Sequence, residues 1–530
     1  MLCMSSLSPT RGAVDATPSR VERSSRVAGA ILGLAAGAVA IGVAHLLAAV
    51  VGREASPVIA VGSASIDLTP EWLKSFAIRA FGERDKVVLL GGIAVVVTIS
   101  AITLGVVSVR RRSAGLAGLA VFGAIGVAAA LTRPTATLLD ALPSVVGALA
   151  GAATLVTLHR RVTSQQPTTP ATEIGVERRR FLLGSAAAVG LAALAGGAGQ
   201  LLSRRFAADG SRAAVVIPPA ADPAAAAPAG VDLELTDLSS FYTPNAEFYR
   251  VDTALIVPAV HAEDWSLRIH GMVERELNLD FAQLIARDLI ERDITLACVS
   301  NEVGGPYIGN ARWVGASLAA LLEEAGIDPA ADQLVSRSVD GFTVGTPTTA
   351  VTDGRDAMLA VQMNGEPLPL EHGFPVRMLV PGLYGYVSAT KWITELELTT
   401  FDAFDPYWIR RGWAEQAPIK TQSRIDTPRP LAKVPAGPAV IAGVAWAQHR
   451  GIERVEVRID EEPWREADLA AEDTVDTWRQ WRLDWDAATP GSHTLQVRAT
   501  DATGATQTEQ RVEPFPDGAT GQHQLVVTVT

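Results

Sequence analysis

Cysteine and histidine are scarce in this chain of 530 residues, which contains 2 cysteines and 8 histidines. Cys3 lies in a polar N-terminal tail and Cys298 in the second half, so an internal disulfide is not expected. The sequence has no zinc-spaced Cys/His cluster and no Cys-x-x-Cys-His motif, which excludes attached c-type haem. It also lacks a glycine-rich phosphate loop and a serine nucleophile elbow. The familiar nucleotide, zinc and serine-hydrolase chemistries are therefore excluded.

Charge is unevenly distributed along the chain. Residues 1–230 hold 21 Lys and Arg against 12 Asp and Glu, which leaves 24 against 45 for residues 231–530. An acidic surface favours solubility and argues against a nucleic-acid partner. The sequence therefore predicts a basic membrane part joined to an acidic soluble part.

Five apolar runs dominate the first 205 residues. Each approaches the roughly 20 residues that cross a bilayer as a helix. The runs are Val27–Val51, Val87–Val109, Ala114–Leu131, Ala141–Leu158 and Phe181–Leu202. Basic clusters precede the first run, follow the second and separate the fourth from the fifth, so threading five helices puts them all on one side. By the positive-inside tendency, we expect a multi-pass protein of the cell membrane with a cytoplasmic N-terminus and an extracytoplasmic region after Leu202.

Two connecting segments carry further signals. Arg178-Arg179-Arg180-Phe181-Leu182 resembles an internal twin-arginine export signal, which serves proteins that fold around a cofactor before export. A plain cluster of anchoring arginines is the alternative. In the external loop 52–86, a helix starting near Pro70 would place Trp72 and Phe76 on one face, as in a helix lying on the membrane surface or an ordinary packed loop helix. Residues 206–230, rich in Ala and Pro, predict a linker.

Residues 231–427 predict a mixed α/β domain with short strands, brief helices and many loops. Cys298 lies where the apolar run 294–297 gives way to a Ser/Asn/Gly-rich turn. A thiol at the end of a strand suits a ligand or a nucleophile. A buried cysteine acting as a small hydrophobe is the alternative at this point.

Residues 428–530 predict an immunoglobulin-like β-sandwich. Apolar residues alternate with polar ones over 455–459 and 495–499, and turn signals separate these runs. The tryptophans of this region are expected in core and edge packing.

Several ordered motifs resemble the sulfite oxidase family of molybdopterin-dependent oxidoreductases, from about Leu235 to the C-terminus. The motifs are Thr243-Pro-Asn245 with Phe248-Tyr249, Leu296-Ala-Cys298 with Asn301, Asn310-Ala-Arg-Trp313, Met363 to Pro369, His372 to Arg377, Pro381-Gly382 and Lys391-Trp392. The resemblance implies molybdenum held by one molybdopterin and by the Cys298 thiolate, and a C-terminal domain that mediates homodimerisation.

The resemblance also implies the other site residues. Expected cofactor-binding residues are Tyr249, Arg250, Cys298, Asp340, His372, Arg377 and Lys391. Cys298 is the expected metal ligand. The expected catalytic residues are Cys298, Trp413 and Arg482. Trp413 stands at the position of a tyrosine in typical sulfite oxidases, and Arg482 matches a basic residue that the sandwich domain contributes to the site in that family.

Three departures concern the substrate. Glu302 and Val303 stand where the family places an arginine after the cysteine, Val251 aligns with another pocket arginine, and Trp413 replaces the tyrosine. A sulfite dianion would meet fewer cations here, although Arg250, Arg410 and Arg411 could compensate.

Three functions follow from these features. The first is a membrane-anchored, exported oxidase of sulfite or a related sulfur compound by two-electron oxygen-atom transfer. The second is a reductase of a sulfoxide or similar S- or N-oxide fed by a membrane donor. The third is a cofactor-free binding protein, which the intact cofactor motifs disfavour. His45 and His159 fall at opposite depths, so no membrane haem is expected and electrons pass to or from a separate partner or a quinone.

Overall fold

The computed structural model describes residues 20–163, 171–205 and 208–530, and it divides the chain into two compact units. The first unit comprises Met1–Leu68 and Lys86–Arg205. The second comprises Thr69–Asp85 and Phe206–Thr530. Each unit has its own packed interior.

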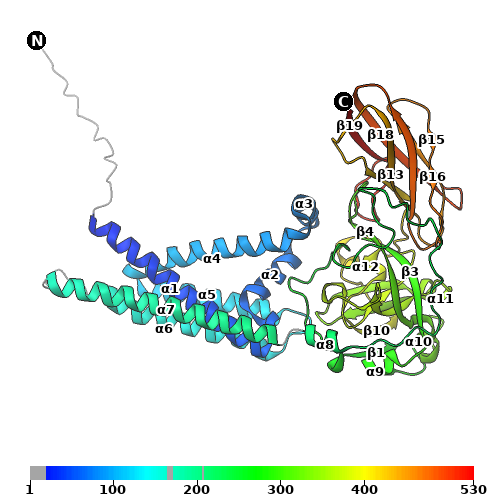
Figure 1. Cartoon of the computed structure of the whole chain (residues 1–530). Coiled ribbons are helices and arrows are strands. Elements are labelled where there is room, and N and C mark those ends of the chain that lie inside the picture. The colour runs from blue at the N-terminus through cyan, green and yellow to red at the C-terminus, as the bar shows by residue number, and fades with distance from the viewer. Residues whose placement is uncertain (1–19, 164–170, 206–207) are drawn as a thin grey trace, which may run out of the picture. The chain divides into compact units, whose positions relative to one another are not determined.

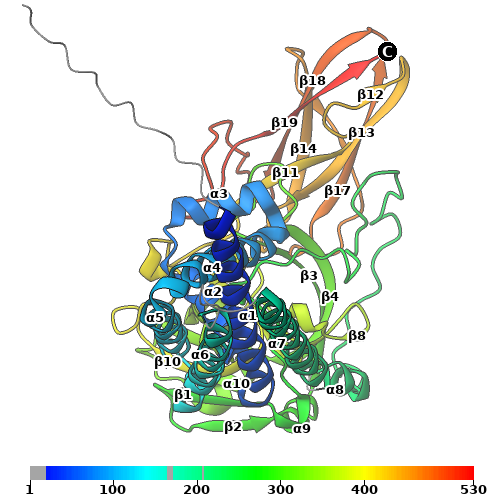
Figure 2. The same ribbon diagram turned by 90° about the vertical axis from the view of Figure 1, so that its left-hand side faces the viewer.

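The first unit consists of helices (Figures 1 and 2). They are α1 (Arg20–Val51), α2 (Pro57–Leu68), α4 (Asp85–Arg110), α5 (Arg112–Leu131), α6 (Leu142–Thr163) and α7 (Ala171–Arg205). Within the described ranges, five helical segments are long and apolar enough to cross a membrane, which confirms the five apolar helices expected from the sequence. Glycine permits close packing between two of them. A Cβ added to Gly33 of α1 would lie 1.9 Å from the carbonyl oxygen of Ala101 in α4.

The second unit contains the mixed α/β domain, whose two sheets are connected by short helices. One sheet has the order β2-β1-β10-β5-β6, and the other has the order β3-β4-β7-β8 with β9 paired to β7. The strands are β1 (Ser266–Gly271), β2 (Leu277–Asp280), β3 (Leu289–Ala297), β4 (Ile308–Ser317), β5 (Gln333–Ser338), β6 (Thr343–Pro347), β7 (Met358–Met363), β8 (Glu366–Pro367), β9 (Arg377–Leu379) and β10 (Ile393–Thr399). The helices are α9 (Phe281–Ile285), α10 (Leu318–Ala325), α11 (Thr348–Thr352) and α12 (Gly385–Ser388).

Local sequence explains these elements. In β1 the exposed and buried positions alternate at first, as expected for a strand with one face on the core. The last five residues of β3 are all buried, which accounts for their continuous apolar character. Helix α10 begins where the Ser317 hydroxyl accepts a hydrogen bond from the Ala320 N–H at 3.3 Å, and it ends at Gly326, whose φ of 72° suits glycine.

The C-terminal domain packs two antiparallel-rich sheets against one core (Figure 1). Their orders are β11-β13-β17-β16 and β12-β19-β18-β14-β15. The strands are β11 (Gln422–Thr427), β12 (Lys433–Val434), β13 (Gly437–Trp446), β14 (Ile452–Ile459), β15 (Arg465–Glu466), β16 (Asp468–Leu469), β17 (Arg479–Ala487), β18 (Gly491–Asp501) and β19 (His523–Val529). Trp481 and Trp485 lie in this core, as expected.

Three boundaries differ from the sequence predictions. Strand β11 pairs with β13, so the sandwich begins near Gln422 and not at residue 428. In the predicted linker, α8 (Asp209–Ala214) forms and the Ala221 N–H donates to the Leu289 oxygen of β3 at 2.8 Å, so this segment packs on the α/β domain. Helix α3 (Glu71–Phe81) belongs to the second unit. In each case a pairing between residues distant in sequence sets the boundary.

Candidate cofactor site around Cys298

Cys298 directly follows β3, and its side chain is buried. Its N–H donates to the Tyr307 carbonyl oxygen at 3.0 Å, and its own carbonyl oxygen accepts from the Asn301 N–H at 3.1 Å. The Asn301 side-chain oxygen in turn accepts from the Tyr307 N–H at 2.8 Å. These bonds close residues 298–307 into an ordered loop between β3 and β4. The thiol is thus held at a fixed point at the end of a strand.

Burial raises the pKa of the Cys298 thiol, while hydrogen bonds from Ser300 and the charge of Lys391 oppose the increase. A thiolate at this position therefore needs a strong cationic partner. A bound metal ion meets that requirement, because it deprotonates a coordinating thiol. A thiol of this kind that binds no metal would stay protonated and inert.

Three cationic or titratable side chains, His372, Arg377 and Lys391, form a buried cluster. His372 Nε2 lies 3.2 Å from the Asn245 carbonyl oxygen, and Arg377 Nη1 donates to the His372 carbonyl oxygen at 3.2 Å. Lys391 Nζ donates to Asp252 Oδ2 at 2.8 Å. Lys391 Nζ also donates to the carbonyl oxygen of Glu371, the neighbour of His372, at 3.0 Å, so the three side chains lie close together.

Burial also lowers the pKa values of this cluster. It lowers the pKa of His372 to about 3, helped by the charges of Lys391 and Arg377, so the imidazole is neutral. It lowers the pKa of Arg377 to about 10 and that of Lys391 to about 8, the latter against the attraction of Asp252. At neutral pH, two buried cations therefore remain charged next to one another. Lys391 has Asp252 as its partner, but Arg377 has no carboxylate partner among the described residues, and desolvation destabilises such an unpaired charge.

The Nε atom of Arg377 supports the conclusion that this cluster needs an anion. Arg377 is 4% exposed, and its Nε atom has no hydrogen-bond acceptor among the described residues. Its guanidinium lies 5.2 Å from the centroid of the Trp313 ring. A buried, unsatisfied donor on a cation fits the phosphate or the polar ring edge of a pterin cofactor. The donor set therefore fits the expected group.

The remaining expected cofactor residues adjoin the same network. Tyr249 stacks on Phe248 at 5.3 Å, and burial and the nearby Cys298 raise the pKa of its hydroxyl. Arg250 Nε donates to Asp252 Oδ2 at 2.9 Å. Burial raises the pKa of Asp340, and Asp252 adds to the increase. Asp252, shared by Arg250 and Lys391, was not predicted, because no local motif distinguishes it from other surface acids.

Trp413 lies in an aromatic group and is 6% exposed. Its ring contacts those of Tyr386 at 5.6 Å, Trp408 at 6.0 Å and Phe515 at 5.4 Å. The indole Nε1 has no acceptor among the described residues. Helix α12 joins this group to the end of β3, because its Tyr386 contacts Trp413 and a Cβ added to its Gly385 would lie 3.7 Å from the Ala297 carbonyl oxygen. The contact of α12 and the role of Ser300 were not predicted, since neither has a recognisable motif.

Arg482 lies elsewhere. It is in β17, opposite Ala442 and Asp468, and it forms an ion pair with Asp484. Among the described residues, no contact links Arg482 to the Cys298 cluster. The sandwich reaches the α/β domain through Trp478 instead, whose N–H donates to the Thr295 hydroxyl at 2.7 Å. Arg411 is engaged as well, with its guanidinium 3.5 Å from the Tyr407 ring centroid.

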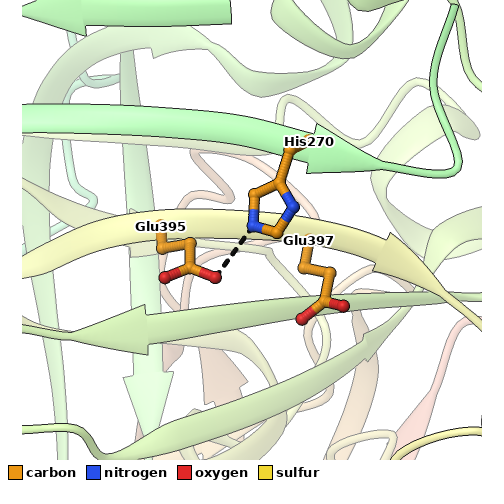
Figure 3. Close-up of side chains that lie close together, drawn as sticks. All are labelled: His270, Glu395 and Glu397. Carbon is orange, nitrogen blue, oxygen red and sulfur yellow. Dashed lines mark hydrogen bonds and ion pairs between the residues drawn. The ribbon is translucent and has the colours of Figure 1, made fainter. Parts of the chain in front are cut away.

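A second polar cluster in the domain has metal-like geometry (Figure 3). His270 of β1 and Glu395 and Glu397 of β10 offer ligand atoms within 4.8 Å of one another, and His270 Nε2 lies 2.8 Å from Glu395 Oε1. However, Arg337 of β5 donates to Glu395 at 3.2 Å and to Glu397 at 2.7 Å. Its guanidinium already balances both carboxylates, so we interpret this cluster as an ion-pair network across the sheet.

Comparisons with known proteins agree with this geometry. Residues 254–408 match the oxidoreductase molybdopterin binding domain. The mitochondrial sulfite oxidase of Drosophila melanogaster is 30% identical over 310 residues, covering 49% of this chain and 52% of the relative, so the chain spans about half the length of that protein. The uncharacterized oxidoreductase YuiH of Bacillus subtilis is 30% identical over 149 residues, covering 28% of this chain and 72% of the relative.

One solved structure is also similar. The sulfane dehydrogenase SoxCD from Paracoccus pantotrophus is 25% identical, with a TM-score of 0.48 over 55% of this chain and 83% of that chain. The matched molybdopterin domain includes the thiol and the buried cations described above. On the sequence comparisons, this chain belongs to the sulfite oxidase family of molybdopterin-dependent oxidoreductases.

Proposed function

We propose that the protein is a membrane-anchored, exported molybdenum-cofactor oxidoreductase that carries out oxygen-atom transfer on sulfite or a related sulfur compound. The observation that carries this proposal is the pairing of the buried Cys298 thiol with two buried cations, one of which has an unsatisfied donor. The thiol ionises only with a cationic partner and the buried Arg377 charge lacks an anionic one, so one anionic metal cofactor would satisfy both.

The chain's residues would then divide the work of holding the cofactor. The Cys298 thiolate would be the metal ligand, since a soft thiolate suits a redox-active metal. Arg377 and Lys391 would bind the phosphate and pterin edge, and the neutral His372 would hydrogen-bond without adding charge. The molybdenum cofactor, when bound, supplies two-electron oxygen-atom transfer. Burial of Tyr249 and Trp413 would exclude water from the site.

A reductase is the second candidate, and the surroundings of Trp413 favour it. Arg250 is engaged by Asp252, and Arg482 by Asp484. The aromatic group around Trp413 instead offers an uncharged wall with a buried N–H donor. An uncharged sulfoxide or N-oxide oxygen could accept that hydrogen bond, whereas a sulfite dianion would gain more from a cation.

We further propose that the five apolar helices span a membrane and that the second unit is extracytoplasmic, which the placement of the basic residues supports. The internal twin-arginine-like segment is consistent with export after cofactor insertion. No haem is proposed within the chain, so a separate electron-transfer partner or a quinone would exchange electrons with the cofactor. An immunoglobulin-like sandwich mediating homodimerisation completes the proposal.

The test begins with the detergent-purified full chain from cells that supply the cofactor. Molybdenum near one per chain supports the cofactor assignment, and absence of the metal contradicts it. On the same sample, sulfite-dependent reduction of an artificial acceptor is compared with sulfoxide-dependent oxidation of a reduced dye. Turnover in the first assay supports the oxidase. Turnover only in the second assay supports the reductase.

A further inference from the structure

Helix α3 lies in sequence between two candidate membrane spans, yet it belongs to the same compact unit as the α/β domain. Its Lys74 contacts this domain through aromatic rings. Lys74 Nζ lies 5.7 Å from the centroid of the Tyr407 ring and 5.4 Å from that of Trp408. A cation over aromatic faces at this distance is attracted to them. The helix is thus docked on the segment that leads to Trp413.

The turn that follows α3 lies near the loop that holds Cys298. Gly82 begins this turn, and a Cβ added to it would lie 3.6 Å from the Tyr307 hydroxyl. Tyr307 closes the loop that holds Cys298, since its carbonyl oxygen accepts the Cys298 N–H. Helix α3 with its turn therefore contacts both segments that flank the candidate cofactor site.

The opposite face of α3 is apolar and exposed. Trp72 is 71% exposed, Phe76 53% and Leu73 38%. At 3.6 residues per turn these three side chains share one side of the helix, and Lys74 points away from them. Water is an unfavourable environment for such an aromatic face. The next element of the chain indicates what covers this apolar face, because the 26-residue apolar helix α4 begins at Asp85, directly after the turn.

We propose that α3 is an interfacial helix: Trp72, Leu73 and Phe76 insert into the lipid headgroup region, and Lys74 fastens the Tyr407–Trp413 segment to the opposite side. The partner is the surface of a lipid bilayer. Aromatic residues are enriched at this depth, and amphipathic helices lie in this plane. The inference rests on the proposed membrane insertion of α4, and it adds that the cofactor site is mechanically tied to the membrane surface.

The first test measures depth by spin labelling. In a Cys3→Ser background in lipid nanodiscs, Phe76→Cys is labelled, and Ala320→Cys on the exposed side of α10 is the matched water-exposed control. Buried Cys298 is checked for labelling in the parent. We expect the label at 76 to be accessible to oxygen, shielded from a nickel chelate and about 5–10 Å below the headgroup boundary. Nickel access equal to that at 320, or shielding from both probes, would overturn the proposal.

The second test addresses the docking. With labels at both 76 and 320, the distance distribution is measured in the parent, in Lys74→Gln and in the control Lys433→Gln, an exposed lysine of β12. Because the cation that lies over both the Tyr407 and the Trp408 ring is lost, we expect the undocked fraction to rise about 2- to 5-fold in Lys74→Gln only. An unchanged distribution would refute the fastening role. Neither readout depends on molybdenum or turnover, so failure here would not affect the proposed chemistry.

Discussion

Two charged clusters in the α/β domain differ in their balance of charge. Around Arg337, one guanidinium and His270 meet two carboxylates, and every partner lies within the cluster. Around Arg377, the carboxylate of Asp252 is shared by Lys391 and Arg250, and the Nε donor of Arg377 has no acceptor among the described residues. The first cluster is complete as it stands. Among the described residues only the second leaves a buried cation without a carboxylate partner, which is why we propose that the cofactor binds there and not at the cluster with metal-like geometry.

The largest expected effect comes from Cys298→Ser, which removes the thiolate while keeping a small polar side chain. Loss of the metal's contribution, several kcal/mol, lowers turnover at least about 1,000-fold. Molybdenum content per chain and turnover are measured together. The unfolding temperature of the cofactor-free form should be unchanged. Tryptophan fluorescence reports on it, since all 11 tryptophans lie in the second unit. Full turnover in this variant would refute the assignment of Cys298 as ligand.

Arg377→Met should have opposite effects on the two forms of the protein. In the cofactor-free form it removes a buried, poorly compensated charge, so we expect stabilisation by about 1 kcal/mol. In the loaded form it removes a charge-assisted bond worth about 1.5–3 kcal/mol, so cofactor retention falls about 10- to 100-fold. Thermal unfolding and molybdenum content measure the two effects. Destabilisation of the cofactor-free form would mean that the cluster is already balanced.

The lowered pKa of Lys391 predicts that stability and cofactor retention depend on pH. Burial lowers its pKa to about 8 from the ordinary 10.5, so the cofactor-free folded state releases this proton at a lower pH than the unfolded state. Its stability should therefore rise between those two values, while affinity for an anion falls as the ammonium is lost. We expect cofactor retention after dialysis to drop between about pH 7 and about pH 9.5, and Lys391→Arg to remove the drop, because arginine stays charged. An identical profile in both proteins would exclude Lys391 as the anion partner.

The smallest expected effect is that of Arg337→Gln in the complete cluster. It leaves Glu395 and Glu397 close together without their shared cation. Because both carboxylates are partly exposed, the loss of folding stability is limited to about 1 kcal/mol. The unfolding temperature should fall slightly, with molybdenum content and turnover unchanged. Loss of molybdenum in this variant would show that the two clusters are not independent.

Local patterns predicted much of the fold. The five apolar runs appear as five apolar helices, because the length of a run is a property of consecutive residues. Helix α10, with Ser317 as its cap, and strands β14 and β18 follow from periodicity and turn residues. The small boundary errors arise at β11 and α3, where pairing with distant residues decides which domain a segment joins.

The sequence by itself determined the candidate thiol and the buried cations, because Cys298, His372, Arg377 and Lys391 stand in long ordered motifs. The tertiary structure alone decided that Asp252 links Arg250 to Lys391, that α12 packs against the end of β3 and that Arg482 pairs within the sandwich. It also decided which charged cluster lacks an anion. Charge balance depends on which side chains meet across strands and loops, and such contacts between distant residues leave no periodic signal in the chain.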